Sequence, residues 1–490
     1  MTVLWNKIQF FADDKPNAVA IIGDHHHYRW SELHSVVLNI AQQLKASDHQ
    51  VIALYADNSP AWVIIDLACY LAEITLLPLP AFFSQQQLAH AIKQAGVSAV
   101  LHQSNNSITG LLKLFSVREN LNIASLDLML TVIEQAAASL PENTAKITFT
   151  SGSTGQPKGV CLSAQQQTVV AESLLSAIEL GATKHLSMLP FSTLLENIGG
   201  IYAPLISGGT VIAVSPSSLG FNGNSSFDLQ TLLTTITYYQ PDSMILLAEL
   251  LMALVNAILQ GWQPPESLKF IAVGGSKVSP QLLQQAYELG LPVYEGYGLS
   301  ECGSVVSLNT PKNNKIGSIG KRLDHVKITT IDNEIIVTGN TFLGYIDDPD
   351  NWLKPTVNTG DLGFVDEQGF LHINGRKKNL LISSFGRNIN PEWLESELLS
   401  NGLLQQAIVF GDAKPFCITL VWPRDKNTTD SDIQSWIDHT NLSLPSYAHI
   451  NDWSRLSESL SVEAGLMTSN GRPVRDKIYQ HYQTTIEQFY

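Results

Sequence analysis

The stretch TFTSGSTGQPKGV, residues 148 to 160, combines small hydroxyl residues and glycines with one lysine between a proline and a glycine. Glycines let backbone N–H groups approach an anion, and Ser and Thr hydroxyls add hydrogen-bond donors. The composition therefore predicts a loop that binds phosphate groups. A flexible Ser/Gly linker has a similar composition but does not explain the ordered string TSGSTGxPKG. The GxxxxGK[ST] phosphate loop is excluded, because Pro157 stands five residues after Gly152 and Gly159 follows Lys158.

Further stretches with residues that could do chemistry follow the phosphate loop along the chain. They are LPFSTLLEN (189–197), VGGSKVS (273–279), YEGYGLSE (294–301), EIIVTGNTFLGYIDDP (334–349), NTGDLG (358–363) and GRKKNLLISSFGRNINPEWLE (375–395). Each is too short to be specific alone, and a lone TGD is an ordinary turn more often than a binding site. Their order along the chain carries more information than any one of them.

Taken together, the motifs resemble those of the adenylate-forming superfamily over residues 20 to 480. That superfamily contains acyl-CoA synthetases, fatty acyl-AMP ligases, peptide-synthetase adenylation domains and luciferases. The resemblance implies a ligase that converts a carboxylate and ATP into an acyl-adenylate and pyrophosphate, after which a thiol displaces AMP. The first step brings a carboxylate to an anionic triphosphate, so it needs positive charge, hydrogen-bond donors and Mg²⁺.

The resemblance also implies roles for individual residues. Lys158 and Glu301 are expected to be catalytic, with Glu301 as the Mg²⁺ ligand, although a surface carboxylate is the simpler reading of Glu301 taken alone. Asp361 is expected to accept the ribose hydroxyls with Arg376 nearby, and Ser300 to contact the α-phosphate. Tyr297 is expected to stack on adenine, unless it is a core tyrosine. The remaining residues expected at the nucleotide are Thr150, Ser151, Gly152, Ser153, Thr154, Gly155, Gly274, Gly275, Ser276, Glu295, Gly296 and Gly298.

The acid is expected to bind at Phe191, Thr193 and Asn197 of the LPFSTLLEN motif. Amino-acid-activating relatives carry an aspartate in this motif, and its absence here disfavours a free amino acid. Thr193 stands where many fatty acyl-CoA synthetases have histidine, yet the surrounding sequence looks most like long-chain acyl-CoA synthetases. We therefore expect a medium- or long-chain fatty acid. The thiol is expected to be CoA, and the phosphopantetheine of an acyl carrier protein presents the same group.

The C-terminal stretch LMTSNGRPVRDKI, residues 466 to 478, departs from the family pattern. The family carries a G-K-x-x-R element whose lysine bridges the carboxylate and the α-phosphate. By position this catalytic lysine is replaced by Arg472, with Arg475 as the later arginine, while Lys477 is out of register. Arginine keeps the charge but is bulkier and planar. Two alternatives stay open: an active ligase, or a degenerate member that binds acyl-adenylate or AMP.

The alternation of strands and helices predicts an α/β fold. Apolar runs such as VIALYA (51–56) and helical stretches such as SELHSVVLNIAQQLKA (31–46) alternate through the first three hundred residues, which indicates parallel sheets covered by helices. Short strands after about residue 305 predict a small antiparallel, barrel-like module. We expect an N-terminal adenylating domain, residues 1–377, and a small mobile α+β domain, residues 378–490. The resemblance implies a hinge at Lys378 and a glycine for the pantetheine arm at Gly386.

Composition sets outer limits on function. The net charge of −15 argues against nucleic-acid binding. The longest apolar run, residues 62 to 83, is interrupted by Asp66 and Glu73, so it predicts a buried helix and strand rather than a membrane span. The N-terminus lacks a basic region followed by an apolar run, and the four cysteines form no metal-binding spacing. These features favour a cytoplasmic protein with free thiols, and they do not specify an oligomeric state.

Overall fold

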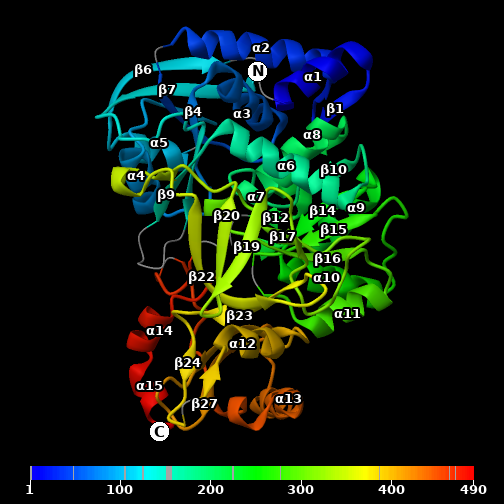
Figure 1. The fold of residues 1–490 in the computed structure, drawn as a ribbon, viewed down its shortest axis with the longest axis vertical. Coiled ribbons are helices and arrows are strands. Elements are labelled where there is room, and N and C mark those ends of the chain that lie inside the picture. Colours follow the sequence, from blue (N-terminus) through cyan, green and yellow to red (C-terminus); the bar gives the residue numbers. More distant parts are fainter. Residues whose placement is uncertain are drawn as a thin grey trace.

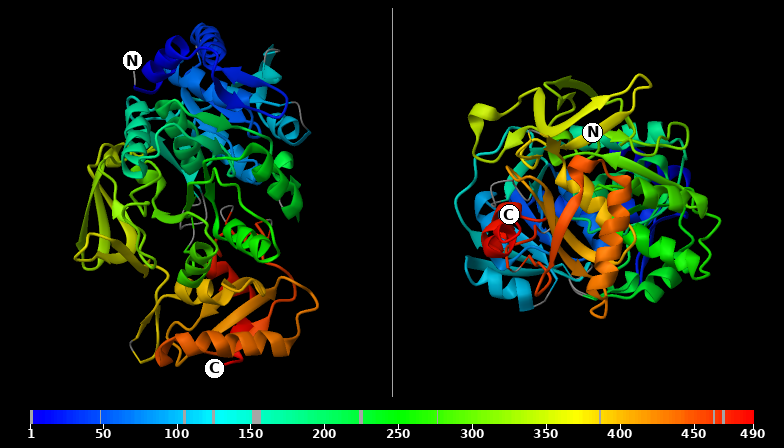
Figure 2. Two further views of the ribbon diagram at one scale, coloured as in Figure 1. Left: turned by 90° about the vertical axis from the view of Figure 1, so that its right-hand side faces the viewer. Right: turned by 90° about the horizontal axis from the view of Figure 1, so that it is seen from below.

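The structure is a computed structural model of the 490-residue chain (Figure 1). It describes residues 3–47, 49–103, 106–123, 126–150, 157–222, 226–275, 277–385, 387–462, 464–468 and 471–490. Two large sheets and their helices form the upper part of the molecule, and the chain from about residue 380 onward forms a smaller part below them (Figure 2). The predicted α/β fold, with a large N-terminal and a small C-terminal part, is confirmed.

The first large sheet has nine strands, of which the central six run parallel. Their side chains alternate between the two faces, and the face that carries Leu186 and Met244 packs on a core of its own. In spatial order the strands are β18 (Lys321–Arg322), β17 (Ser307–Leu308), β16 (Val293–Tyr297), β15 (Phe270–Val273), β14 (Ser243–Leu246), β10 (Lys184–Leu186), β11 (Thr210–Ile212), β1 (Val19–Ile22) and β2 (His27–Arg29).

The second large sheet has eight strands, and β8, β4, β3 and β5 at its centre are parallel. The strand predicted from VIALYA is β3, which pairs with β4, and both are fully buried. In spatial order the strands are β21 (Gly344–Tyr345), β9 (Lys158–Leu162), β8 (Lys146–Thr150), β4 (Thr75–Pro78), β3 (Val51–Tyr55), β5 (Ala99–His102), β7 (Leu128–Glu134) and β6 (Ser116–Ile123).

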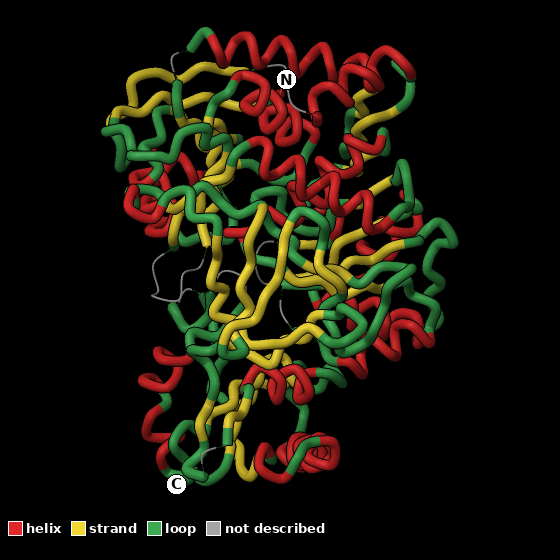
Figure 3. Tube along the Cα trace, in the orientation of Figure 1, coloured by secondary structure: helices red, strands yellow, loops and turns green. Residues whose placement is uncertain are grey.

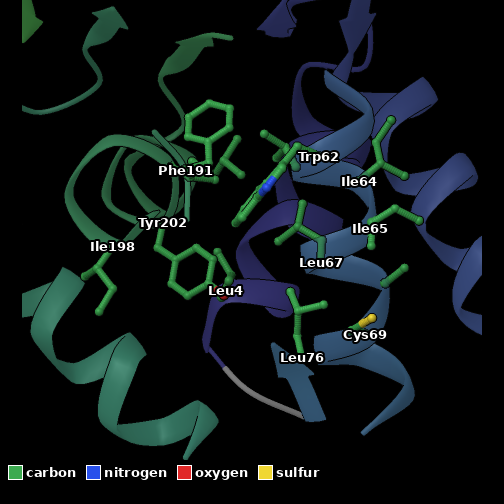
Figure 4. Close-up of a cluster of buried hydrophobic side chains, with 14 of the residues drawn as sticks. Leu4, Trp62, Ile64, Ile65, Leu67, Cys69, Leu76, Phe191, Ile198 and Tyr202 are labelled. Carbon is green, nitrogen blue, oxygen red and sulfur yellow. The ribbon is translucent and has the colours of Figure 1, made fainter. Parts of the chain in front are cut away.

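Helices cover the sheets, as the alternation predicted (Figure 3). The predicted helix at residues 31–46 is α2, and the apolar run at residues 62–83 divides into α3 and β4. Figure 4 shows how Trp62 and Leu67 on α3 face Phe191 and Tyr202 from the segment that follows β10. The helices of this part are α1 (Val3–Asp14), α2 (Trp30–Lys45), α3 (Pro60–Ala72), α4 (Gln85–Gln94), α5 (Asn106–Leu112), α6 (Ala164–Ile178), α7 (Leu194–Glu196), α8 (Ala203–Ser207), α9 (Leu229–Tyr239), α10 (Ala248–Leu259) and α11 (Pro280–Glu288).

The antiparallel module is a four-stranded sheet of β19 (Val326–Ile331), β20 (Glu334–Gly339), β22 (Thr356–Val365) and β23 (Leu371–Arg376). The barrel-like shape that we expected is wrong. Among the described strands, β19 pairs with β20 and β23 pairs with β22, so the two edge strands do not meet and the sheet stays open. In Figure 1, β22 and β23 lie between the large sheets and the C-terminal part. Asp361 and Arg376 are direct partners in this pair of strands.

The C-terminal part packs its own hydrophobic core around Leu394, Val409 and Ile433, separate from the cores of the large sheets. Its three-stranded sheet mixes one antiparallel and one parallel pair. The elements are β24 (Leu381–Ile382), β25 (Asn388–Ile389), α12 (Pro391–Leu399), β26 (Leu404–Phe410), β27 (Cys417–Pro423), α13 (Asp430–Ser443), β28 (Ile450–Arg455), α14 (Arg475–His481) and α15 (Gln483–Glu487). This is the predicted α+β composition.

Two expectations from composition can be compared with the structure. Within the described residues, no helix combines the length and the apolar character that a membrane crossing requires. The four cysteines are free and buried: Cys69, Cys161, Cys302 and Cys417.

Candidate active site

A cleft with a cavity volume of about 3400 Å³ lies between the large sheets and the C-terminal part. It brings together predicted residues that are more than 300 positions apart in the sequence, from Thr150 to Arg472. The predicted residues that line it are Thr150, Lys158, Phe191, Thr193, Gly274, Gly275, Glu295, Gly296, Tyr297, Gly298, Ser300, Glu301, Asp361, Arg376, Lys378 and Arg472.

Several predicted residues lie outside the described part of the chain. They are Ser151, Gly152, Ser153, Thr154, Gly155, Ser276 and Gly386. The residues that flank the phosphate loop are described, and Thr150 and Lys158 are direct partners in the antiparallel pair of β8 and β9. This pairing sets Lys158 at the start of β9, where its side chain is exposed at the cleft. A positive charge and hydrogen-bond donors are thus available at this end of the cleft.

Glu301 lies near Lys158 and is held by Tyr345, a tyrosine of the 334–349 motif to which no role was assigned. The Tyr345 hydroxyl donates a hydrogen bond of 2.8 Å to Glu301 Oε1, and Lys158 Nζ lies 5.2 Å from the centre of the Tyr345 ring. Burial and the adjacent Glu301 carboxylate raise the pKa of Tyr345, so the phenol stays neutral and donates. Glu301, the candidate metal ligand, and Lys158 therefore lie in the same corner of the cleft, and both contact Tyr345.

The donor set at Glu301 fits Mg²⁺. No cluster of three or more His, Cys, Asp or Glu side chains suited to a metal occurs among the described residues, so a protein cage for the ion is absent there. Mg²⁺ is commonly bound by one or two carboxylates together with phosphate oxygens and water. Glu301 can supply the carboxylate, and when bound the ion would neutralise phosphate charge during the reaction.

The predicted ribose site consists of three side chains, two of which donate hydrogen bonds to the third. Asp361 is buried and accepts from the Tyr297 hydroxyl at 2.5 Å and from Arg376 Nε at 2.8 Å. Asp361 and Arg376 are direct partners across β22 and β23, which fixes their contact. Burial and then Asp361 raise the pKa of Tyr297 well above its ordinary value. The carboxylate is held rigidly and keeps lone pairs that can accept ribose hydroxyls.

The turn between Tyr297 and Ser300 needs a glycine. A Cβ on Gly298 would lie 1.5 Å from the carbonyl oxygen of Ser304, so no other residue fits without moving the backbone. The close approach lets the chain leave β16 and enter the single turn that carries Ser300 and Glu301. The motif glycine thus positions Glu301, the candidate metal ligand.

Arg472 reaches from the C-terminal part to the nucleotide side of the cleft. Its Nη2 donates a hydrogen bond of 2.7 Å to the carbonyl oxygen of Gly275, in the glycine stretch predicted near adenine. Arg472 is exposed to solvent on one side. Partial desolvation at the cleft lowers its pKa, the nearby Arg376 lowers it further, and Glu392 and Asp361 oppose the shift. Arginine stays protonated under all ordinary conditions. A permanent cation therefore stands beside Asp361 and Arg376, where the family has its lysine.

The other two basic residues of that element have different surroundings. Arg475 contacts Glu395 Oε2 at 2.5 Å and donates to the carbonyl oxygen of Val409 at 3.0 Å, with its side chain only 13% exposed. It fastens α14 to the core of the C-terminal part. Lys477 also lines the cleft, but Arg472 makes the contact across it.

The expectation that Asn197 lies in the acyl pocket is wrong for this structure. Asn197 does not line the cleft: its side chain is buried, donates to Asp66 Oδ2 at 3.0 Å and accepts from Lys146. Lys146 also forms an ion pair of 2.6 Å with Asp66. A buried pair of charges needs further hydrogen bonds to offset its desolvation, and Asn197 supplies them. The periodicity of the motif could not reveal this, because Asp66 comes from α3.

The acyl motif is held by residues that sequence reasoning missed. Asn58 accepts from the backbone N–H of Phe191 and donates to the carbonyl oxygen of Leu189, both at 2.8 Å. This pair of bonds fixes the loop that presents Thr193 to the cleft. A buried asparagine in a loop after a strand was the available signal, but nothing in the sequence indicates its partner.

A polar group lies on the sheet beneath the same motif. His185 on β10 hydrogen bonds through Nε2 to Glu196 Oε1 at 3.0 Å and through Nδ1 to Ser243 Oγ at 2.9 Å. All three are buried, and His185 and Ser243 contribute to the lining of the cleft. His185 and Ser243 are register partners on β10 and β14, which explains their contact.

Comparison with known proteins identifies the family. Residues 8–346 match the family described as AMP-binding enzyme, and residues 378–490 match the AMP-binding enzyme C-terminal domain. The chain therefore belongs to the AMP-binding enzyme family, the adenylate-forming superfamily that the motifs predicted.

Named relatives and solved structures agree with this assignment. The 2-succinylbenzoate–CoA ligase of Staphylococcus epidermidis is 27% identical over 405 residues, which cover 79% of this chain and 80% of the relative. The long-chain-fatty-acid–CoA ligase FadD15 of Mycobacterium bovis is 32% identical over 250 residues, 44% of this chain and 41% of the relative. The o-succinylbenzoate CoA synthetase of Bacillus subtilis, solved with its acyl-adenylate, superposes with a TM-score of 0.79 at 22% identity and covers 96% of this chain and 97% of that chain. That likeness shows the fold.

The comparisons confirm some of the predictions in full and others only in part. An enzyme of the adenylate-forming superfamily is confirmed. The predicted ATP, Mg²⁺ and CoA accord with relatives named as CoA ligases and with a Bacillus subtilis structure that holds ATP and magnesium. The finer resemblance to long-chain fatty acyl-CoA synthetases is confirmed only as far as the superfamily, because the relatives include ligases of both 2-succinylbenzoate and fatty acids.

Proposed function

We propose that this chain converts a carboxylic acid into its CoA thioester in two steps. In the first step a carboxylate oxygen attacks the α-phosphorus of ATP, the bond to the β-phosphate breaks, and pyrophosphate leaves. In the second step the CoA sulfur attacks the acyl carbon, the bond to AMP breaks, and the thiol proton passes to solvent. Residues 1–377 form the adenylating domain in this proposal, and residues 378–490 rotate about Lys378 between the steps.

The contact of Arg472 with Gly275 carries this proposal. It sets a permanent cation in the cleft that also holds Lys158, Glu301 and Asp361. The charge that develops when a carboxylate meets a triphosphate is stabilised by preorganised cations. A degenerate member would have no need for this arrangement, so the contact favours an active ligase over a protein that only binds AMP.

A medium- or long-chain fatty acid is the acid that the cleft favours. The lining of the cleft includes aliphatic side chains from α6, from the loop after it and from α7. Burial of a methylene contributes about 0.8 kcal/mol. These side chains are Leu174, Leu175, Ile178, Leu180, Leu194 and Leu195.

A second class of acid is favoured by the polar group beneath the motif. Ser243 and His185 lie among the lining residues, so a substrate could place a carbonyl, hydroxyl or second carboxylate there. The relatives named as 2-succinylbenzoate–CoA ligases act on such an acid. The aliphatic lining is the larger part of this surface, which is why the fatty acid stands first.

An acid panel tests the proposal. Pyrophosphate release would be measured with acetate, octanoate, palmitate, benzoate and 2-succinylbenzoate, each with CoA and with a holo acyl carrier protein. We expect the highest turnover with octanoate or palmitate and CoA. Ile178→Trp, which narrows the aliphatic lining, should then lower turnover with palmitate more than with acetate. Highest turnover with 2-succinylbenzoate would favour the second class of acid. Turnover with the carrier protein but not with CoA would mean that the carrier protein is the thiol acceptor. No turnover with any acid would refute the proposal that the chain is a ligase.

A further inference from the structure

The segment of residues 342 to 346 joins two parts of the site that come from different motifs. At one end, the backbone N–H of Phe342 donates 2.7 Å to the carbonyl oxygen of Glu301. At the other end, the N–H of Ile346 donates 3.1 Å to the carbonyl oxygen of Gly159, the residue after Lys158. The metal-ligand candidate and the phosphate lysine are therefore tied to one short stretch of backbone.

The packing of this segment against β9 is close at a glycine. A Cβ on Gly159 would lie 2.3 Å from Cδ1 of Ile346, so a larger residue would require the Ile346 side chain to move. With glycine there, β21 pairs directly with β9, and Tyr345 lies opposite Val160. The PKG string of the phosphate loop thus does more than bind phosphate: its glycine admits the strand that carries Tyr345.

Tyr345 occupies the position between the two functional side chains. Its hydroxyl donates to Glu301 Oε1 at 2.8 Å, and its ring lies beneath Lys158 Nζ at 5.2 Å. The Trp352 indole N–H donates to the Tyr345 carbonyl oxygen at 2.7 Å, and the Phe342 ring packs edge-on against the Tyr345 ring at 4.9 Å. These contacts restrain both the backbone and the ring of Tyr345. Tyr345 can therefore restrain Glu301 and Lys158 in turn.

We propose that Tyr345 is the positioning residue that orients Glu301 and Lys158 for magnesium-bound ATP. The hydroxyl occupies one oxygen of the Glu301 carboxylate and so directs the carboxylate toward the phosphate side of the cleft. The electron-rich ring face attracts the Lys158 ammonium and limits where it can move. The role rests on the proposed function, since it presumes that ATP and Mg²⁺ bind in this cleft.

Two substitutions separate the two contacts. Tyr345→Phe removes the hydroxyl and keeps the ring, so it should release Glu301 without disturbing Lys158. A hydrogen bond to a charged group is stronger than one between neutral groups, so the Mg²⁺ concentration for half-maximal ATP binding should rise about 10-fold or more. ATP affinity without Mg²⁺ should not change. Tyr345→Leu removes the ring as well and should weaken ATP binding even without Mg²⁺.

ATP binding would be measured by calorimetry across a magnesium series, so that the result does not depend on turnover. Tyr70→Phe is the matched control, because its hydroxyl bonds Thr168 at 2.9 Å and Tyr70 does not line the cleft. It should leave the magnesium midpoint unchanged. In a Glu301→Gln background, Tyr345→Phe should have no further effect, since it acts through Glu301. This double variant keeps the test valid if Tyr345→Phe alone lowers stability.

The outcomes distinguish this role from the proposed function. A normal magnesium midpoint in Tyr345→Phe, or a shift that persists in the Glu301→Gln background, would overturn the positioning role and leave the ligase intact. A wild-type protein that binds no ATP at any magnesium concentration would overturn both.

Discussion

Replacement of Arg472 by alanine should abolish adenylate formation while sparing the second half-reaction. The Arg472 guanidinium donates to Gly275 at 2.7 Å and stands among Asp361, Arg376 and Glu392, where partial desolvation lowers its pKa. A hydrogen bond from a charged donor is stronger than one from a neutral donor. Loss of one preorganised donor to developing charge costs about 10²–10³ in rate, or about 3–4 kcal/mol.

The measurement is acyl-AMP formed per enzyme in a single turnover, by wild type and by Arg472→Ala. Thioester formation from a preformed acyl-adenylate serves as the internal control, because rotation of the C-terminal domain would carry Arg472 away before that step. Full adenylation by Arg472→Ala would refute the reasoning. Another cation that lines the cleft, Lys277 or Lys477, would then make the bridge.

Arg472→Lys should keep adenylation but give it a pH dependence that the wild type lacks. Arginine remains a cation even when its pKa is lowered, whereas lysine starts from a lower value. Desolvation and the neighbouring Arg376, which lower the pKa of Arg472, should lower that of a lysine in the same place. The protonated form is the active one, so activity of the variant should fall as pH rises through that pKa. A flat alkaline profile in the variant would show that the cation is not needed.

Three further outcomes are expected. Burial raises the pKa of Glu295 from 4.5 to about 7 in the folded protein. Below pH 4.5 the carboxyl is protonated in both the folded and the unfolded state, so the folded state carries no penalty. The free energy of unfolding then falls as pH rises from 4.5 through 7, because the buried carboxyl must lose its proton. Glu295→Gln should therefore add about 3 kcal/mol to the free energy of unfolding at pH 8, measured by urea titration, and no change would mean an ordinary pKa. Asp361→Ala should raise the KM for ATP about 100-fold and leave that for the acid nearly unchanged; a loss confined to the acid would refute the ribose assignment. Lys378→Pro should impair one half-reaction far more than the other, because proline fixes φ at the proposed hinge; equal losses in both would argue against a hinge there.

The sequence predicted the site best where a motif lies within one continuous turn or strand. The stretch from Tyr297 to Glu301 is such a case, because its glycine is required by the backbone and its polar residues all reach the cleft. Asp361 and Arg376, predicted from two different motifs, lie together because they are partners across one hairpin. Arg472, a departure from the family pattern, lines the same cleft and donates to Gly275, and its role at the α-phosphate stays a prediction.

Residues whose role depends on a partner from a distant element could not be found in this way. Tyr345 contacts Glu301 and Lys158 because β21 pairs with β9, a register that no local pattern reveals. Asn197 has the right place in the acyl motif, but Lys146 and Asp66 draw its side chain into the core. The open antiparallel sheet is a similar case, because strand patterns do not show whether the edge strands meet.

The charges around Arg472 also bear on the order of the two steps. Arg376 lowers the pKa of Arg472, which means that the two guanidinium groups repel each other. A bound triphosphate adds negative charge that offsets this repulsion, and departure of pyrophosphate removes most of that charge. Glu392 and Asp361 attract the Arg472 guanidinium and oppose part of this repulsion. We therefore expect the position of Arg472 in the cleft to be more stable before adenylation than after it. Because Lys378 follows Arg376 by two residues, rotation there would separate the two cations directly. The Arg472→Ala variant, relieved of this repulsion, should form the thioester from acyl-adenylate at least as fast as the wild type, and a slower second step in that variant would mean that the repulsion does not influence the rotation.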